Sequence, residues 1–191
     1  MSREPNEFFQ YRGYLHFLAK QHLSTRYNGK LDQSDIVQQT LLKAFAKQAQ
    51  FQGQTEAEML AWLRQILART VAHATRELRT KKRDIQREQS IAADLDASST
   101  RLESFLAGKE ATPSQNFMRK DQVRIVAAAI ELLPEEQRQV VILRYWEEKS
   151  WLEISELLGK SISAVFGLHH RARKKLRRHM DAESTNFDTL C

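Results

Sequence analysis

Apolar residues recur at intervals of three and four positions along most of this chain. This spacing predicts amphipathic helices over residues 7–23, 34–48 and 56–83, each with one side to bury. The apolar positions that define these buried sides are Phe8, Tyr11, Leu15, Leu18, Val37, Leu41, Ala44, Phe45, Leu60, Leu63, Leu67, Val71, Ala74 and Leu78. Because glycine and proline are scarce, the whole chain is expected to be all-α.

The last third of the chain carries start and stop signals for further helices. Pro134 suits a first helical turn, where its missing N–H costs nothing, and Gly159 suits the left-handed position that ends a helix over 151–158. Ser161 is a favourable N-cap for the helix that follows. The buried stripe of that last helix is expected to comprise Ile162, Val165, His169, Ala172 and Leu176.

The other side of the last helix is polar, small or basic, and the helix ends in RARKKLRR. We predict a helix-turn-helix DNA reader, in which the N-terminal half of this helix enters a major groove and the C-terminal half neutralises phosphates. The residues expected to contact DNA are Ser161, Ser163, Phe166, Gly167, His170, Arg171 and Lys174. An ordinary helical hairpin with a solvated basic face is the alternative interpretation.

Basic residues gather in two clusters. Residues 69–83 hold six basic side chains and one acidic, and residues 171–178 hold six basic and none acidic, whereas residues 84–136 hold ten acidic and six basic. Two contacts with a polyanion, joined by a segment that does not bind it, fit this pattern. The first contact is predicted to use Trp62, Arg69, Arg76, Arg79 and Arg83. Trp62 is expected either to stack on an unpaired base or to pack on the first helix.

The outer side of the predicted 34–48 helix holds a second candidate surface. Its members are Asp35, Gln38, Gln39 and Leu42. An apolar residue framed by Asp and Gln, away from the core, indicates a partner surface, although a single exposed leucine also occurs without any partner.

Nothing in the sequence indicates an enzyme, a metal site or a cofactor. The six histidines lack metal-ligand spacing, and there is no glycine-rich phosphate loop and no nucleophile beside a base. Cys191 is the single cysteine, which favours a reducing compartment. Without a bilayer-length apolar run or a signal peptide, we expect a soluble cytoplasmic protein that binds neither a membrane nor a small-molecule substrate.

Three segments resemble, in the same order, the motifs of bacterial RNA polymerase sigma factors of the sigma-70 family, in their short extracytoplasmic-function (ECF) form. They are DIVQQTLLKAF at 35–45, Trp62-Leu63 with ILAR at 66–69, and the segment 132–177 that contains the predicted turn. The chain departs from the family pattern at Gln39, where an acidic residue is usual, and at Thr70, where asparagine is usual. Its long acidic segment is similar to that of variants common in planctomycetes.

The resemblance implies a role for each predicted surface. Core RNA polymerase would bind the side of the 34–48 helix with Asp35 and Leu42, the helix with Trp62 would face the −10 element of promoter DNA, and the last helix would read the −35 element. The implied function is a sigma factor that directs promoter-specific initiation and assists DNA opening. Whether an anti-sigma factor also binds stays open. The alternative is a helix-turn-helix regulator that binds DNA without polymerase.

The charge pattern and the resemblance predict two small helical domains joined by a flexible acidic linker. The expected boundaries are 1–84 for the N-terminal domain, 85–111 for a linker that contains short helices, 112–180 for the helix-turn-helix domain and 181–191 for a tail. Thr112 and Pro113 supply the cap and first turn that open the second domain.

Overall fold

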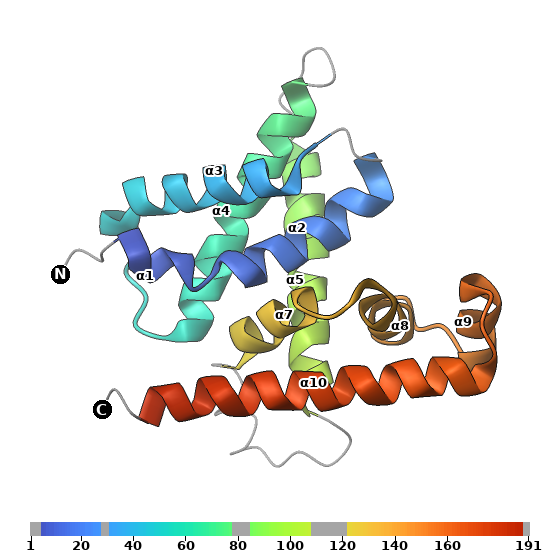
Figure 1. Ribbon diagram of the computed structural model, residues 1–191. Coiled ribbons are helices and arrows are strands. Elements are labelled where there is room, and N and C mark those ends of the chain that lie inside the picture. The colour runs from blue at the N-terminus through green and yellow to red at the C-terminus, as the bar shows by residue number, and fades with distance from the viewer. Residues whose placement is uncertain (1–4, 28–30, 78–84, 108–121, 189–191) are drawn as a thin grey trace.

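A computed structural model describes residues 5–27, 31–77, 85–107 and 122–188, and every regular element within these ranges is helical. This confirms the predicted all-α class. The elements, labelled in Figure 1, are α1 Pro5–Phe9, α2 Arg12–Tyr27, α3 Gln33–Ala46, the 3₁₀ turn η1 Gln48–Gln50, α4 Glu56–Glu77, α5 Ile85–Ala107, α7 Val123–Glu131, α8 Glu135–Tyr145, α9 Trp151–Leu158 and α10 Ile162–Asp188. The cap predicted at Thr112 and Pro113 lies outside the described residues.

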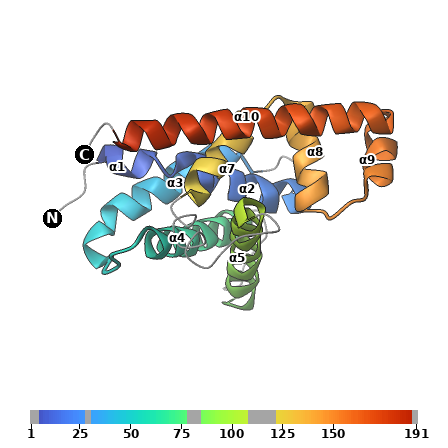
Figure 2. The same cartoon turned by 90° about the horizontal axis from the view of Figure 1, so that it is seen from below.

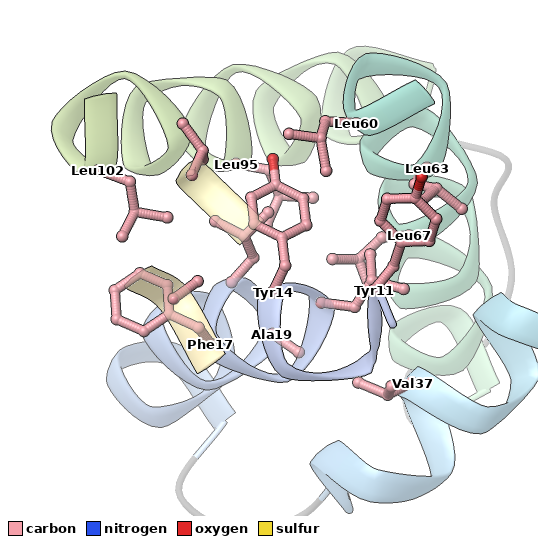
Figure 3. Close-up of a cluster of buried hydrophobic side chains, with 14 of the residues drawn as sticks. Tyr11, Tyr14, Phe17, Ala19, Val37, Leu60, Leu63, Leu67, Leu95 and Leu102 are labelled. Atoms are coloured by element: carbon pink, nitrogen blue, oxygen red, sulfur yellow. The ribbon is translucent and has the colours of Figure 1, made fainter. Parts of the chain in front are cut away.

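Helix α2 is the centre of the N-terminal half and contacts α3, α4 and α5. In Figure 3 its side chains Tyr14 and Phe17 point toward leucines of α4 and α5. The expected single helix over 7–23 is interrupted after Phe9, where the N–H of Tyr11 donates to the carbonyl of Phe8 at 3.1 Å. The helix expected from Ser34 begins one residue earlier, because the Asp32 carboxylate caps it by accepting the Ser34 N–H at 2.7 Å.

The segment expected to be a linker, 85–111, holds instead one helix of 23 residues, α5. Its apolar residues Ile91, Leu95 and Leu102 are buried and lie four and seven positions apart, which places them on one face. The polar run Ser98-Ser99-Thr100, which is typical of a loop, lies within this helix and is accommodated by tertiary contacts. The hydroxyl of Ser99 accepts a hydrogen bond from Tyr14 at 3.0 Å and another from Arg64 at 3.2 Å.

Helix α7 is buried on almost every side. Its sequence VRIVAAAIE is apolar except for Arg124 and Glu131, and the buried residues are Val123, Arg124, Ile125, Val126, Ala127, Ala129 and Ile130. A helix of this kind needs packing partners on opposite faces. In both Figure 1 and Figure 2, α7 lies between α2 and α10, and it contacts both of them. The two predicted halves therefore meet in one continuous core.

Close approach between α2 and α7 depends on Gly13 of α2. A Cβ built there would lie 2.6 Å from the Cβ and 2.9 Å from the Cα of Ala128. Nearby, the rings of Phe17 and Trp146 meet edge to face with their centroids 5.0 Å apart. The missing side chain thus lets two helices from distant parts of the sequence touch through their backbones.

Two ion pairs join the halves at the rim of this interface. Nδ1 of His16 lies 2.9 Å from Oε2 of Glu131, and Nε of Arg124 lies 3.3 Å from Oε1 of Glu56. Burial alone raises the pKa of Glu131, but its hydrogen bond with His16 and the charges of Lys20, His16 and Arg138 outweigh burial and hold the pKa below its usual value. Its contribution to stability is therefore present at neutral pH and lost as the pH falls through that lowered pKa.

Leu95→Ala tests whether α5 is part of the core. Leu95 is fully buried, so its truncation should lower the free energy of unfolding by about 2–5 kcal/mol, as measured by urea denaturation of the full chain. The exposed neighbour Arg101 provides the control, and Arg101→Ala should change stability by less than about 0.5 kcal/mol. Equal, small effects of both substitutions would mean that this helix is not packed.

Gly13→Ala tests the interface between the halves. In a free helix the change is stabilising, because alanine loses less entropy than glycine. Here the new methyl group collides with the Ala128 backbone, so we expect a net loss of about 1–3 kcal/mol in the free energy of unfolding. Arg12→Ala, one residue away and exposed, is the control. A gain in stability for Gly13→Ala would show that α2 and α7 do not meet closely in solution.

Candidate nucleic-acid interface

Helices α8, α9 and α10 form the helix-turn-helix, and local capping fixes its turn. Ser150 and Glu153 form a capping box at the start of α9: the Ser150 N–H donates to the Glu153 carboxylate at 2.8 Å, and the Glu153 N–H donates to the Ser150 hydroxyl at 3.3 Å. The bonds from Ser150 hold the pKa of Glu153 below its usual value. Gly159 ends α9 with a φ of +61°, as predicted from the sequence.

The reader helix α10 begins at the predicted cap. The hydroxyl of Ser161 accepts the Ala164 N–H at 3.2 Å. The unit has a small core of its own, formed by Val140, Ile154, Val165 and Leu168. One expectation was wrong: Ile162 is 42% exposed, and Leu168 is buried instead. Ile162 lies in the first turn of the helix, whereas Leu168 is three residues after Val165 and four before Ala172, on the packed stripe.

The predicted DNA face of α10 is open to solvent. Ser161, Ser163, Phe166, His170, Arg171 and Lys174 are exposed, and Gly167 is half-exposed. A Cβ at Gly167 would lie 3.3 Å from Nη1 of Arg171, so the absence of a side chain leaves room for the guanidinium beside the helix backbone. The structure therefore brings all seven predicted residues to one accessible side.

Further along α10, a basic cavity of about 430 Å³ extends this face. It is lined by His170, Arg173, Lys174 and Arg177. Arg173 and Arg177 were not among the residues predicted to contact DNA, although their spacing of three and seven residues from His170 places them on the same side of a helix. The cationic side chains of Arg173, Lys174 and Arg177 in this cavity fit phosphate oxygens.

Helix α4 carries the described part of the first basic cluster. Arg69 and Arg76 are exposed, and Nε of Arg69 lies 3.1 Å from Oε1 of Glu88 in α5. Arg79 and Arg83 lie outside the described residues. The ring of Trp62 is half-buried, with centroids 6.4 Å from Phe8 and 5.2 Å from Phe51. These contacts correspond to the packing alternative, and stacking on a base stays a prediction.

The outer side of α3 is accessible as predicted. Asp35, Gln38 and Gln39 are exposed, and Leu42 is 69% exposed. The buried side differs from the expectation at Phe45, which is 36% exposed and meets Phe8 edge to face.

Two residues that the sequence pattern did not select, Ile36 and Thr40, are buried in α3 instead. Burial of Thr40 is tolerated because its hydroxyl donates to the carbonyl of Ile36 at 2.7 Å.

Among the described helices, none is both long and apolar enough to cross a lipid bilayer.

The reader unit matches a known family. Residues 124–176 match the family described as Sigma-70, region 4. This range begins in α7, includes α8 and α9, and ends in α10 after the predicted DNA face. The fold and this match together define a helix-turn-helix domain of the sigma-70 region 4 class.

The similarity to known proteins extends over most of the chain. The ECF RNA polymerase sigma-E factor of Escherichia coli (strain K12) is 28% identical over 165 residues, which is 85% of this chain and 80% of the relative. The sigma-E factor of Salmonella typhimurium (strain LT2) gives the same values. That of Haemophilus influenzae is 29% identical over 154 residues, 81% of this chain and 77% of the relative. These findings support the interpretation of the chain as an ECF sigma factor of the sigma-70 family, a protein that directs transcription.

Replacing Arg171 and Lys174 together by alanine tests the reader face. If each binds a phosphate, duplex DNA should bind more weakly, and the slope of log Kd against log salt concentration should fall by about one unit for each phosphate that is no longer neutralised. A double alanine variant at the exposed residues Arg12 and Arg101, far from α10 in the sequence, has the same change in net charge and should leave the slope intact. Equal slopes for both variants would place Arg171 and Lys174 in solvent.

Proposed function

We propose that this protein binds core RNA polymerase, directs it to a subset of promoters by reading −10 and −35 elements, and assists DNA opening. The observation that carries this proposal is that the Sigma-70, region 4 match falls on the helix-turn-helix whose predicted DNA-contacting residues are exposed on one side. Phosphate contacts from the basic end of α10 would fix its position on duplex DNA, and side chains near its start would read base edges.

The N-terminal half is proposed to supply the other two contacts. The exposed face of α3, formed by Asp35, Gln38, Gln39 and Leu42, would bind polymerase. Arg69 and Arg76, the exposed arginines of α4, would attract the −10 region together with Arg79 and Arg83, which follow in the sequence. Trp62 is half-buried against Phe8 and Phe51, and the unpacked part of its ring would stack on a non-template base once the strands separate.

Several finer points belong to the same proposal. The chain performs no reaction of its own and needs no cofactor, because its work is binding and positioning. It acts in the cytoplasm, where polymerase and promoter DNA are present. The length and acidity of the segment between the two basic clusters support a planctomycete-type variant. An anti-sigma factor would be a further partner.

The rival function is a DNA-binding regulator that never contacts polymerase. The two functions differ in what the purified chain does alone. A regulator binds its target duplex tightly without help, whereas the proposed sigma factor forms a specific promoter complex only after addition of core RNA polymerase. Tight, specific binding by the chain alone, unchanged by core enzyme, would overturn the proposal.

Leu42→Arg tests the polymerase face. Leu42 is 69% exposed and outside the core, so thermal melting and helix content should stay nearly unchanged. Because a buried, unpaired charge at an interface is costly, complex formation with core RNA polymerase in a pull-down assay should be abolished. Leu132 is 67% exposed and distant in sequence, so Leu132→Arg is a matched control that should still bind. Normal polymerase binding by a folded Leu42→Arg chain would remove α3 from the interface.

A further inference from the structure

An aromatic contact supports the exposed ring of Phe166 on the reader helix. The ring centroids of Phe166 and Trp151 are 4.7 Å apart, and their planes are inclined by 40°. Trp151 is the first residue of α9 and packs against the small core of the helix-turn-helix. Phe166 is 46% exposed. Its ring therefore rests on Trp151 and still presents nearly half of its surface outward.

Trp151 is in turn held by α8 and α10. The guanidinium carbon of Arg144 lies 4.9 Å from the indole centroid, and its Nη1 donates to the carbonyl of Lys149 at 2.9 Å. The ring of His169 meets the indole edge to face at 4.9 Å, and its Nε2 lies 3.0 Å from the Tyr145 hydroxyl. The indole is thus fixed from two helices, which restricts the positions open to Phe166.

The charge state of His169 favours this packing. Burial lowers the pKa of His169, and the nearby charges of Arg173, Arg144 and His170 lower it further. The lowered pKa favours the neutral imidazole, which adds no positive charge beside Arg144.

The residues around Phe166 indicate which chemical group its exposed ring would contact. The neighbouring exposed side chains of α10 include Ser163, His170, Arg171 and Lys174, which are polar or basic and suit a polyanion, and the apolar Ile162 one turn earlier. In the major groove of duplex DNA, the apolar group that a base edge presents is the C5 methyl of thymine. A rigid apolar ring within a basic face therefore has a direct counterpart on DNA.

We propose that Phe166 contacts the methyl group of one thymine in the −35 element, and that Trp151 is the positioning residue that holds Phe166 for this contact. The inference rests on the proposed function and adds a base preference to it. Burial of one methyl group corresponds to about a fourfold change in affinity. Because the ring contacts a single methyl group, the preference for thymine belongs to a single position of the element.

Deoxyuridine substitution isolates the methyl group. A preferred −35 element is first selected from random sequences by holoenzyme assembled from the full chain and core RNA polymerase. Each thymine of that element is then replaced in turn by deoxyuridine, which lacks only the C5 methyl. We expect one position at which holoenzyme affinity falls by about fourfold, with little change at the others.

Three variants assign the effect to the aromatic pair. Phe166→Ala should bind thymine and deoxyuridine equally at that position. Trp151→Leu keeps apolar volume but removes the stacked ring, so it should weaken the discrimination while the rest of the element is still bound. Trp151→Phe restores an aromatic ring and should restore the discrimination, which a merely structural defect would not do. Leu157→Ala removes an exposed apolar side chain of α9, outside the predicted DNA-contacting residues, and is the matched control.

The outcomes separate this inference from the function on which it rests. If no holoenzyme forms, or no sequence is selected, both the proposed function and the inference fail. If a −35 element is selected but deoxyuridine has no effect, or has the same effect with Phe166→Ala, the thymine contact is overturned alone. If Phe166→Ala instead prevents binding to core RNA polymerase, Phe166 meets protein and not DNA. Unchanged discrimination by a folded Trp151→Leu chain would overturn the positioning role.

Discussion

The burial of α7 on opposite faces is the constraint on which the rest of the structure depends. A nine-residue helix with seven buried residues cannot be covered by the reader domain alone, so it packs on α2 as well as on α10. Gly13 lets the two helices come close enough, and the polar residues that α7 brings into the interface, Arg124 and Glu131, are paired across it. The apolar surface of one helix therefore sets the relative position of the two halves.

The surfaces proposed for binding are the sides that this core leaves uncovered. Helix α3 buries Ile36, Val37 and Ala44 against the bundle and leaves Leu42 exposed. Helix α10 buries Val165 and Leu168 within the helix-turn-helix, and farther along Ala172 and Leu176 join the common core. One helix thus belongs to both the helix-turn-helix and the interface between the halves, so packing and the proposed DNA contacts use opposite sides of the same element.

Aromatic residues mark where the proposed sites join the core. Trp62 packs on Phe8 and Phe51 at the edge of the N-terminal bundle, and Trp151 supports Phe166 at the edge of the reader. In both places a large ring is partly buried and partly exposed. Such residues lose little conformational freedom on binding, because packing has already fixed them. Their partial burial also means that a substitution there changes stability as well as binding, and experiments need controls for both.

The sequence alone determined the features that depend on neighbouring residues in a helix. The left-handed cap at Gly159, the N-cap at Ser161 and the exposure of Leu42 follow from local hydrogen bonding and from the 3.6-residue period.

Only the tertiary structure decided the features that depend on distant partners. The serines of α5 are typical of a loop, and their place in a buried helix depends on the hydrogen bonds that Tyr14 and Arg64 donate to Ser99. The packing of α7 on α2 depends on the absence of a side chain at Gly13. Ile162 is exposed although the sequence pattern predicted its burial, and Trp62 is half-buried although the pattern left its role open. Both have the same cause. Helical periodicity gives the direction of a side chain, but the rest of the fold decides whether another element covers it.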